Sequence, residues 1–313
     1  MRGGSPYFAI VLGHSDNPIS VCIVCRNEAD ELESCLASAA WADEVIVLDL
    51  QSTDGSSEVA RKHGVRVIPH AAVPIVEAVR NVVADTASGE WILALDPDER
   101  VSPGLAAELK RVSKLGDCDA VVVPRMNIDF GYAPTSPLQR YEPQLRMYRR
   151  RVVRWPTLPN ALPHVSPDRV VRLPERDDLV LLHERYRSIP DSLERFIRYA
   201  PAQARAMIES GEQFTARRML RTLGQKLYRH LVMARALRDG VPGLIRAGVL
   251  VAFHFYVWAA FWHQSGARRT PADDRLLRRV DLALVAWSRF TRVVLSPLFV
   301  ARKLLARRRH SQR

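Results

Sequence analysis

The segment from residue 19 to residue 100 most constrains the fold, because apolar runs alternate within it with helix-like segments. Residues 19–25, 44–49 and 91–95 are mostly apolar, as expected of buried strands. A segment with apolar residues at helical spacing follows the first run, and another precedes the third. This alternation predicts an α/β domain built on a parallel sheet.

Polar residues stand where each of these runs ends. The first run is followed by Arg26-Asn27-Glu28, the second ends in Asp49, and the third continues into Asp96-Pro97-Asp98. Parallel sheets bind ligands at the edge where the strands end, so we expect these side chains to share one edge. Two carboxylates on a stiff turn suit a Mg²⁺ or Mn²⁺ ion, or sugar hydroxyls. An isolated Asp-x-Asp is usually just an acidic turn.

Four motifs in a fixed order resemble family 2 glycosyltransferases. They are similar, more narrowly, to the bacterial branch that adds sugars to the lipopolysaccharide core. The motifs are Ser20–Glu28, Val45–Gly55, Arg80-Asn81 and Gly89–Arg100. Weaker resemblance continues in Gln144–Arg149, His183–Ile189 and Asp239–Leu244.

The resemblance implies a GT-A-like, Rossmann-type sheet flanked by helices, over residues 18–215. It implies that Asp49 meets the nucleotide base, that Arg80 meets the diphosphate, and that Asp98, with Asp96, binds Mg²⁺ or Mn²⁺. The implied donor-binding residues are Arg26, Asn27, Glu28, Asp49, Asp54, Arg80 and Asp96. Structural alternatives remain open: Asp49 and Asp54 as caps, Glu28 as a helix-start charge, Arg80 as a solvated helix residue.

An inverting transfer also needs a carboxylate that can take the proton of the acceptor hydroxyl. Related sequences place an acid just before a Gln-Leu-Arg-like run, so Glu142 is the candidate base and Asp129 and Glu184 are the fallbacks. The chain has Val165 after His164, where the branch usually has Glu. The segment before Arg80 also lacks the aromatic, glycine and glutamine common in relatives. Five arginines expected to face an anionic acceptor or solvent are Arg146, Arg149, Arg150, Arg151 and Arg154.

The net charge of +12 is unevenly distributed. Residues 216–313 contain 21 Lys/Arg and four Asp/Glu, so they carry +17 and leave −5 for the rest. Residues 217–238 have the pattern of a basic amphipathic helix, and residues 280–305 repeat it. Residues 247–262 are apolar except for His254, but sixteen residues are short for a membrane span, so an interfacial or re-entrant segment is expected.

We therefore expect residues 216–313 to form a helical extension that binds an anionic membrane surface on the cytoplasmic side. A soluble helical subdomain or an oligomer contact is the alternative. Nucleic acid is disfavoured as a partner, because the aromatic residues lie in apolar runs rather than among exposed basic residues. Residues 1–17 are read as a lead-in without the core of a signal peptide, and the four cysteines as reduced core thiols.

The predicted function is transfer of a sugar, with inversion, from a nucleotide sugar to a glycolipid or cell-envelope polysaccharide, with a UDP-sugar as the expected donor. One rival is a nucleotidyltransferase that makes nucleotide sugars. Such an enzyme needs a Gly-rich phosphate loop after the first strand, and Arg26-Asn27-Glu28 is not one. The other rival is a degenerate scaffold that binds nucleotide sugars without turnover, suggested by Val165.

Overall fold

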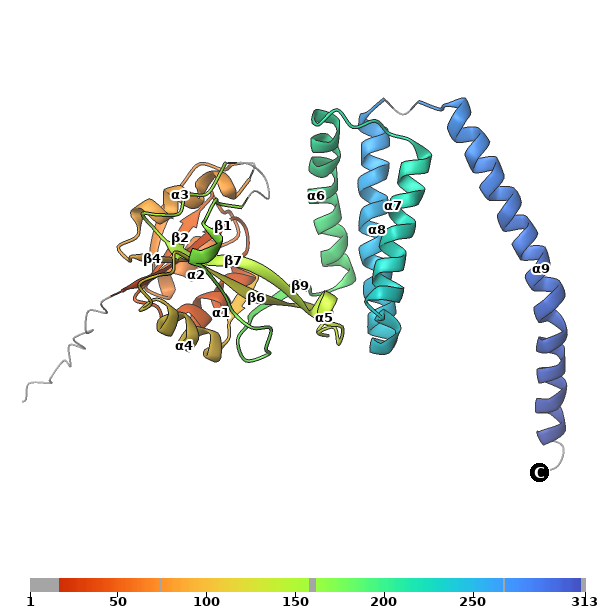
Figure 1. Ribbon diagram of the computed structural model, residues 1–313, viewed down its shortest axis with the longest axis horizontal. Coiled ribbons are helices and arrows are strands. Elements are labelled where there is room, and N and C mark those ends of the chain that lie inside the picture. Colours follow the sequence, from red (N-terminus) through yellow and green to blue (C-terminus); the bar gives the residue numbers. More distant parts are fainter. Residues whose placement is uncertain (1–16, 74, 158–161, 267, 311–313) are drawn as a thin grey trace, which may run out of the picture. The chain divides into compact units, whose positions relative to one another are not determined.

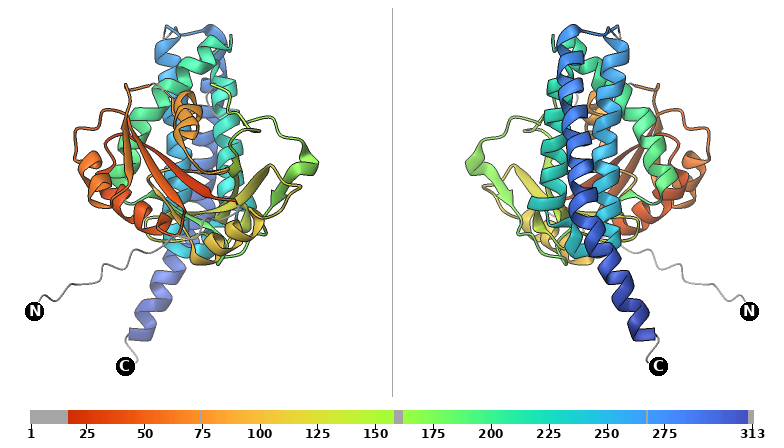
Figure 2. Two further views of the ribbon diagram at one scale, coloured as in Figure 1. Left: turned by 90° about the vertical axis from the view of Figure 1, so that its left-hand side faces the viewer. Right: turned by 90° about the vertical axis from the view of Figure 1, so that its right-hand side faces the viewer.

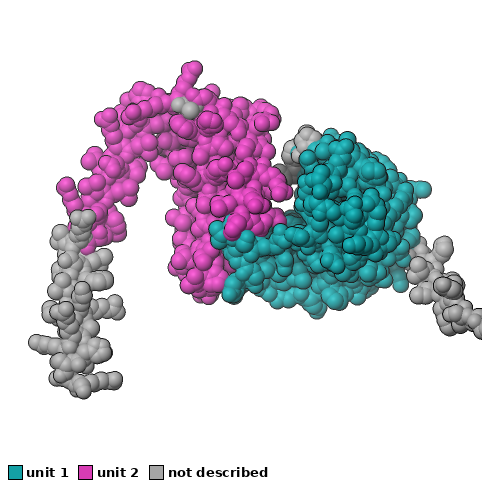
Figure 3. Space-filling view, turned by 180° about the vertical axis from the view of Figure 1, so that it is seen from behind, with its two compact units in different colours: residues 1–189 teal, residues 190–313 magenta. Residues whose placement is uncertain are grey.

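The computed structural model describes residues 17–73, 75–157, 162–266 and 268–310 (Figure 1). Residues 1–16 of the predicted lead-in lie outside this range. The chain divides into two compact units, Met1–Ile189 and Pro190–Arg313 (Figure 3). This division comes earlier than the predicted boundary between residues 215 and 216. The reason is that Ala204 shares a buried apolar cluster with Trp258 and Phe261, which places its helix in the second unit.

One mixed sheet forms the centre of the first unit, as the alternating pattern predicts. Its strand order is β3-β2-β1-β4-β7-β6-β9-β5, and β8 pairs with β6. Strands β3, β2, β1 and β4 are parallel, whereas β7 runs antiparallel to β4. The strands are β1 Ile19–Cys25, β2 Glu44–Asp49, β3 Arg66–Pro69, β4 Trp91–Leu95, β5 Glu99–Val101, β6 Ala120–Asp129, β7 Tyr141–Arg149, β8 Val170–Arg172 and β9 Leu181–Tyr186.

Helices cover both faces of this sheet, and two apolar clusters fill the space between them (Figure 1). Helices α1 and α4 pack in one cluster through residues such as Leu32 and Leu105, and α3 packs in the other through Val79 and Val83. The helices of this unit are α1 Ala29–Ala39, α2 Ser56–Lys62, α3 Glu77–Thr86, α4 Pro103–Val112 and the single turn α5 Pro137–Arg140. The fold is therefore the expected α/β sheet flanked by helices.

The four cysteines are free thiols buried in this unit, in line with the expectation of reduced core residues. Burial raises the pKa of Cys22 and of Cys25 to about 12, so neither is an ionised thiolate near neutral pH.

The second unit is helical. It contains α6 Ile189–Glu209, α7 Ala216–Tyr228, a π turn Arg229–Met233, a 3-10 turn Ala236–Asp239, α8 Gly240–Gln264 and α9 Pro271–His310. In this unit α7 and α8 lie side by side (Figure 2).

The apolar run at residues 247–262 lies inside a longer helix, α8, than the run itself indicates. The helix has 25 residues, a length of about 37 Å at 1.5 Å per residue. Among the described helices, the stretch Ala236–Gln264 alone is long and apolar enough to cross a membrane, judged by length and composition. The sequence pattern underestimated the length of the helix for two reasons. Arg246 interrupts the apolar run, and the Pro-Gly pair near the start of the helix is of a helix-breaking type.

Candidate active site

The strand ends with polar residues do meet at one edge of the sheet. Strand β1 lies between β2 and β4, with Cys25 opposite Asp49 and Ile23 opposite Leu95. Strands β2 and β4 are therefore two inter-strand spacings apart, about 10 Å. Asp49 ends β2 and Asp96 directly follows β4, so the two residues lie at the same edge of the sheet, as the sequence predicts.

The loops after β1 and β2 are joined to one another by hydrogen bonds. The Asn27 amide N–H donates to the Ser52 hydroxyl (3.0 Å), and the Asn27 side-chain oxygen accepts from the Thr53 amide (2.7 Å). Asn27 has φ 56° and Gln51 has φ 58°, both in the left-handed region that non-glycine residues seldom adopt. The hydrogen bonds therefore hold the two loops against each other at the sheet edge. Arg26 and Glu28 flank Asn27 in the loop after β1.

Asp49 and Asp54 hold the loop after β2 in shape. Asp49 is buried and accepts from the Ser52 amide (3.2 Å) and the Ser57 hydroxyl (2.8 Å). Asp54 accepts from the Ala29 amide (2.9 Å) and from the Ser56 amide (3.0 Å), at the first residues of α1 and α2. Burial raises the pKa of Asp54, but these hydrogen bonds lower it by more, so the pKa lies below its usual value. Asp54 therefore bonds the first amides of both helices, as the capping alternative expects, whereas Asp49 contacts a loop amide and a side-chain hydroxyl and caps neither helix.

Asp96 lies between two arginines from different elements. Arg80 of α3 places Nη2 3.3 Å from Asp96 Oδ1, and Arg146 of β7 forms an ion pair with Oδ2. Burial raises the pKa of Asp96, but Arg146 and Arg80 lower it well below its usual range. Arg80 also stacks on Trp155, 4.9 Å from the ring centre, so it is held in place rather than solvated.

Each carboxylate oxygen of Asp96 is directed to an arginine, so Asp96 orients two guanidinium groups, one of which is the arginine expected to meet the donor diphosphate. Contact of Asp96 with a metal ion or with the donor stays a prediction.

Arg146 reaches Asp96 because it is the extra residue of a β-bulge. Across the β6–β7 pair, Val121 lies opposite Met147 and Val122 opposite Leu145, so Arg146 has no residue opposite it. A bulge re-aims the side chain that it carries. The Arg146 side chain is only 4% exposed, which overturns the expectation that it faces an acceptor or solvent.

Glu99 completes this cluster, and the sequence analysis did not single it out. Its side chain is fully buried and accepts from Arg146 Nη2 (2.5 Å), Arg125 Nη1 (3.2 Å) and the Asp96 amide (3.1 Å). The turn from Asp96 to Glu99 is thereby anchored to β6 and β7. The sequence carries no local signal for this role, because Glu99 follows directly on the polar run that begins at Asp96, and only its burial shows that it needs a partner.

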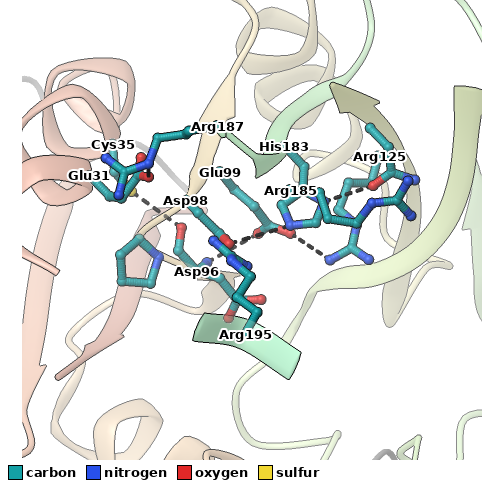
Figure 4. Close-up of polar contacts among 12 residues, drawn as sticks. Glu31, Cys35, Asp96, Asp98, Glu99, Arg125, His183, Arg185, Arg187 and Arg195 are labelled. Carbon is teal, nitrogen blue, oxygen red and sulfur yellow. Dashed lines mark hydrogen bonds and ion pairs between the residues drawn. The ribbon is translucent and has the colours of Figure 1, made fainter. Parts of the chain in front are cut away.

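Asp98 faces His183 of β9, as Figure 4 shows. The Asp98 Oδ2 and His183 Nε2 atoms are 3.4 Å apart, and both side chains are largely buried. The other ring nitrogen, Nδ1, lies 2.7 Å from the Asn127 side-chain oxygen, a hydrogen bond that orients the ring and leaves Nε2 directed at Asp98. The sequence offered His183 only as part of a weak resemblance.

These two residues fit a divalent cation that is also held by substrate. Carboxylate and imidazole ligands suit Mn²⁺, and Mg²⁺ usually takes one or two protein carboxylates plus phosphates and water. Within the described residues, no group of three His, Cys, Asp or Glu side chains is placed to hold a metal ion. The remaining ligands would therefore come from a diphosphate and water.

The candidate base Glu142 belongs to the same cluster through Arg125. The Arg125 guanidinium contacts Glu142 (2.5 Å) and Glu99 (3.2 Å). Burial raises the pKa of Glu142, but Arg125, Asn127 and His183 lower it to a net value below normal. Because 46% of its side chain is exposed, this ionised carboxylate remains open to an acceptor.

The two fallback bases are placed less well. Asp129 is fully buried, and Arg185 donates to both of its oxygens (2.9 and 2.5 Å). Glu184 is exposed on β9, in the position next to His183 where side chains point to the other face of the strand. Its amide N–H donates to the Asp98 carbonyl (3.3 Å).

Comparison with known proteins places a family model over most of this unit. Residues 20–170 match the family described as glycosyl transferase family 2. A TPR repeat-containing protein of Synechococcus elongatus is 33% identical over 142 residues, which are 44% of this chain and 35% of that protein. The lipopolysaccharide core biosynthesis glycosyltransferase LpsC of Rhizobium meliloti is 23% identical over 274 residues, 83% of this chain and 97% of LpsC.

Among solved structures, the mannosyltransferase PcManGT of Pyrobaculum calidifontis, in complex with GDP-Man and Mn²⁺, has a TM-score of 0.42 at 16% identity and covers 86% of this chain and 81% of its own. S. aureus TarS 1-349 in complex with UDP also has a TM-score of 0.42 at 16% identity, with 80% and 92% coverage. The family match spans β1 to β4 and the strand ends that gather Asp49, Asp96 and Asp98. Residues 20–170 of this chain therefore form a glycosyltransferase domain of family 2.

Proposed function

We propose that the chain transfers a sugar, with inversion, from a nucleotide sugar to a glycolipid or cell-envelope polysaccharide. The placement of Asp98 beside His183 carries this proposal, because the pair lies at the sheet edge where Arg80 and the loops after β1 and β2 gather. A UDP-sugar is the proposed donor. The acceptor class rests on the lipopolysaccharide role named for LpsC, to which this chain is similar over nearly the whole length of that protein.

Five residues of the cluster have a role in this proposal. Asp98 and His183 would hold Mg²⁺ or Mn²⁺, which neutralises charge on the departing nucleoside diphosphate. Arg80 grips the diphosphate with its planar guanidinium. Glu142 takes the proton of the acceptor hydroxyl, and Arg125 keeps its carboxylate ionised before that transfer.

The position of Val165 bears on the choice of base. Val165 packs against the apolar cluster that contains Tyr148 and Trp155, so this chain has an apolar contact where its relatives usually have an acid. In the proposal, Glu142 of the charged cluster is therefore the base, and no residue at position 165 takes part in proton transfer.

Product analysis tests the proposal. Purified protein is incubated with Mn²⁺, an acceptor glycolipid extract and single nucleotide sugars. We expect free nucleoside diphosphate, released faster when acceptor is present. Release of pyrophosphate would instead indicate a nucleotidyltransferase, and donor binding without any turnover would indicate a scaffold.

We also propose that residues 216–313 attach the enzyme to the anionic cytoplasmic face of a membrane, where a lipid-linked acceptor would be available. The charge of +17 in this segment and the apolar helix α8 support the proposal. Fractionation of cells into soluble and membrane parts tests it, and recovery of the chain in the soluble part alone would contradict it.

A further inference from the structure

The connection between α7 and α8 exposes an unusual concentration of aliphatic side chains. It consists of the end of α7, the π turn, the 3-10 turn and the first turns of α8, residues 227–245, which together form one end of the α7–α8 pair (Figure 2). We call this region the α7–α8 tip. Its aliphatic side chains that are 44–66% exposed are Leu227, Val232, Met233, Leu237, Val241, Leu244 and Ile245.

The backbone of the tip is tightly built, so these side chains are presented outward by a fixed scaffold. A Cβ atom on Gly243 would lie 1.9 Å from the Ala236 carbonyl oxygen, which shows how closely α8 approaches the 3-10 turn. Ala234 and Ala236 are fully buried between these elements. The exposed aliphatic side chains therefore do not belong to the interior of the helical unit.

The tip also conceals its only acidic group. Asp239 is the sole Asp or Glu between Glu212 and Asp273 in the sequence, and it forms an ion pair with Arg246. The side chain of Arg246, the residue just after the tip, is 1% exposed and that of Asp239 is 7% exposed, so the charge of Asp239 is neutralised by a buried partner. The exposed charges of the tip are consequently all positive, on Arg229, Arg235 and Arg238.

We propose that the α7–α8 tip inserts into the surface of an anionic bilayer. The aliphatic side chains enter the boundary between headgroups and acyl chains, while Arg229, Arg235 and Arg238 extend to lipid phosphates. Tyr228, 57% exposed beside them, has the amphipathic ring that favours the headgroup level. This inference rests on the proposed membrane attachment and names the surface that makes it.

Charge decides between a bilayer and a second copy of the chain. In a two-fold dimer the same patch meets itself, which would bring the arginines of one copy near those of the other. Like charges facing each other across an interface oppose association, whereas anionic phosphates satisfy them. The tip therefore matches lipid better than itself.

Vesicle flotation of the full-length protein tests the proposal. The vesicles contain phosphatidylcholine alone, or phosphatidylcholine with one third phosphatidylglycerol. The double variant Leu237→Glu/Val241→Glu is expected to lower the partition coefficient on the anionic vesicles at least tenfold. The control Val152→Glu changes a side chain of the first unit with similar exposure, 59% against 66% for Val241, and is expected to bind as the unchanged protein does.

A second measurement does not depend on losing binding. A polarity-sensitive dye on Val241→Cys should shift to the blue on anionic vesicles, whereas the same dye on Val152→Cys should not shift. The four native thiols are buried, so the introduced cysteine is the reactive one. An unshifted dye at position 241 in vesicle-bound protein would overturn the tip as the contact surface.

The outcomes also separate this inference from the proposals on which it rests. If the unchanged protein does not float, both the membrane attachment and the tip are refuted, while nucleoside diphosphate release still reports on transferase activity. If the double variant floats normally, only the tip is refuted. If the protein floats with both kinds of vesicle only while a second protein is bound to it, the contact is with a protein partner. That outcome would also overturn the tip as a lipid contact.

Discussion

At the scale of single residues, Asp98 and His183 make the sharpest prediction. Asp98→Ala or His183→Ala should weaken Mn²⁺-dependent binding of a nucleoside diphosphate by about tenfold or more, because each removes one of the two proposed protein ligands. Calorimetric titration with and without Mn²⁺ measures this. Glu184→Ala, at the exposed neighbouring position, is the matched control, and unchanged binding in Asp98→Ala would remove the metal assignment.

Replacing Glu142 by glutamine tests its role as the base. Glu142→Gln keeps the shape of the side chain but removes the ionised group, so the transfer rate should fall about 100-fold while the dissociation constant of the donor stays the same. Separate measurements of kcat and of donor binding distinguish the two. A normal kcat in Glu142→Gln would show that another acid is the base. The variant Glu184→Gln provides the comparison.

Arg146→Met is expected to destabilise the first unit by about 3 kcal/mol or more at pH 7, because it leaves Asp96 and Glu99 without their shared buried partner. The pKa of Asp96 is depressed in the folded state, so its stabilising contribution is present above the unfolded pKa of about 3.9 and is lost as the pH falls below it. The gap between variant and unchanged protein should therefore narrow in acid.

Urea unfolding at several pH values measures this gap. Arg154→Met is the control, because Arg154 and Asp85 form an ion pair with both side chains about half exposed, and such pairs are worth about 1 kcal/mol or less. A gap that stays constant down to pH 3, roughly one unit below the unfolded pKa, would contradict the assigned cause.

At the scale of elements, Gly243 tests whether the close approach of α8 to the 3-10 turn stabilises the helical unit. Gly243→Ala places a methyl group against the Ala236 carbonyl, so we expect a lower melting temperature. Gly248→Ala is the control in the same helix. It has open space around it, and we expect it to raise stability by about 0.5–1 kcal/mol through helix propensity.

The elements themselves were largely predictable from sequence, and the cluster was not. The strands are local apolar runs, so their ends and the shared edge follow from residues 19–95 alone. The partnership of Asp98 with His183 joins β4 to β9 through the fold, which no local pattern encodes. The bulge at Arg146 is likewise invisible in the sequence, so the ion pair of Arg146 with Asp96 could not be predicted.

At the scale of the whole molecule, the division at Ile189 changes how the chain should be cut. Truncation after Gly211, which the sequence boundary suggests, keeps α6 but removes α7 and α8, exposing Ala204 and Phe196. We expect that fragment to aggregate, whereas a fragment ending at Ile189 should stay monomeric and bind nucleoside diphosphate.

Size-exclusion chromatography and vesicle flotation of both fragments measure this difference. The fragment ending at Ile189 should also fail to float, because it lacks the basic helices. A monomeric fragment ending at Gly211 would show that α6 does not need its helical neighbours.

The arginine anchors around the turn from Asp96 to Glu99 have a consequence for how a reaction would be timed. Arg125 and Arg146 fasten this turn to strands β6 and β7, so Asp98, proposed to act on the leaving diphosphate, and Glu142, proposed to accept the proton, are linked by ion pairs. Unproductive hydrolysis of the donor would then depend on whether water or the acceptor hydroxyl occupies the position beside Glu142. It would not depend on a conformational change that brings the catalytic groups together.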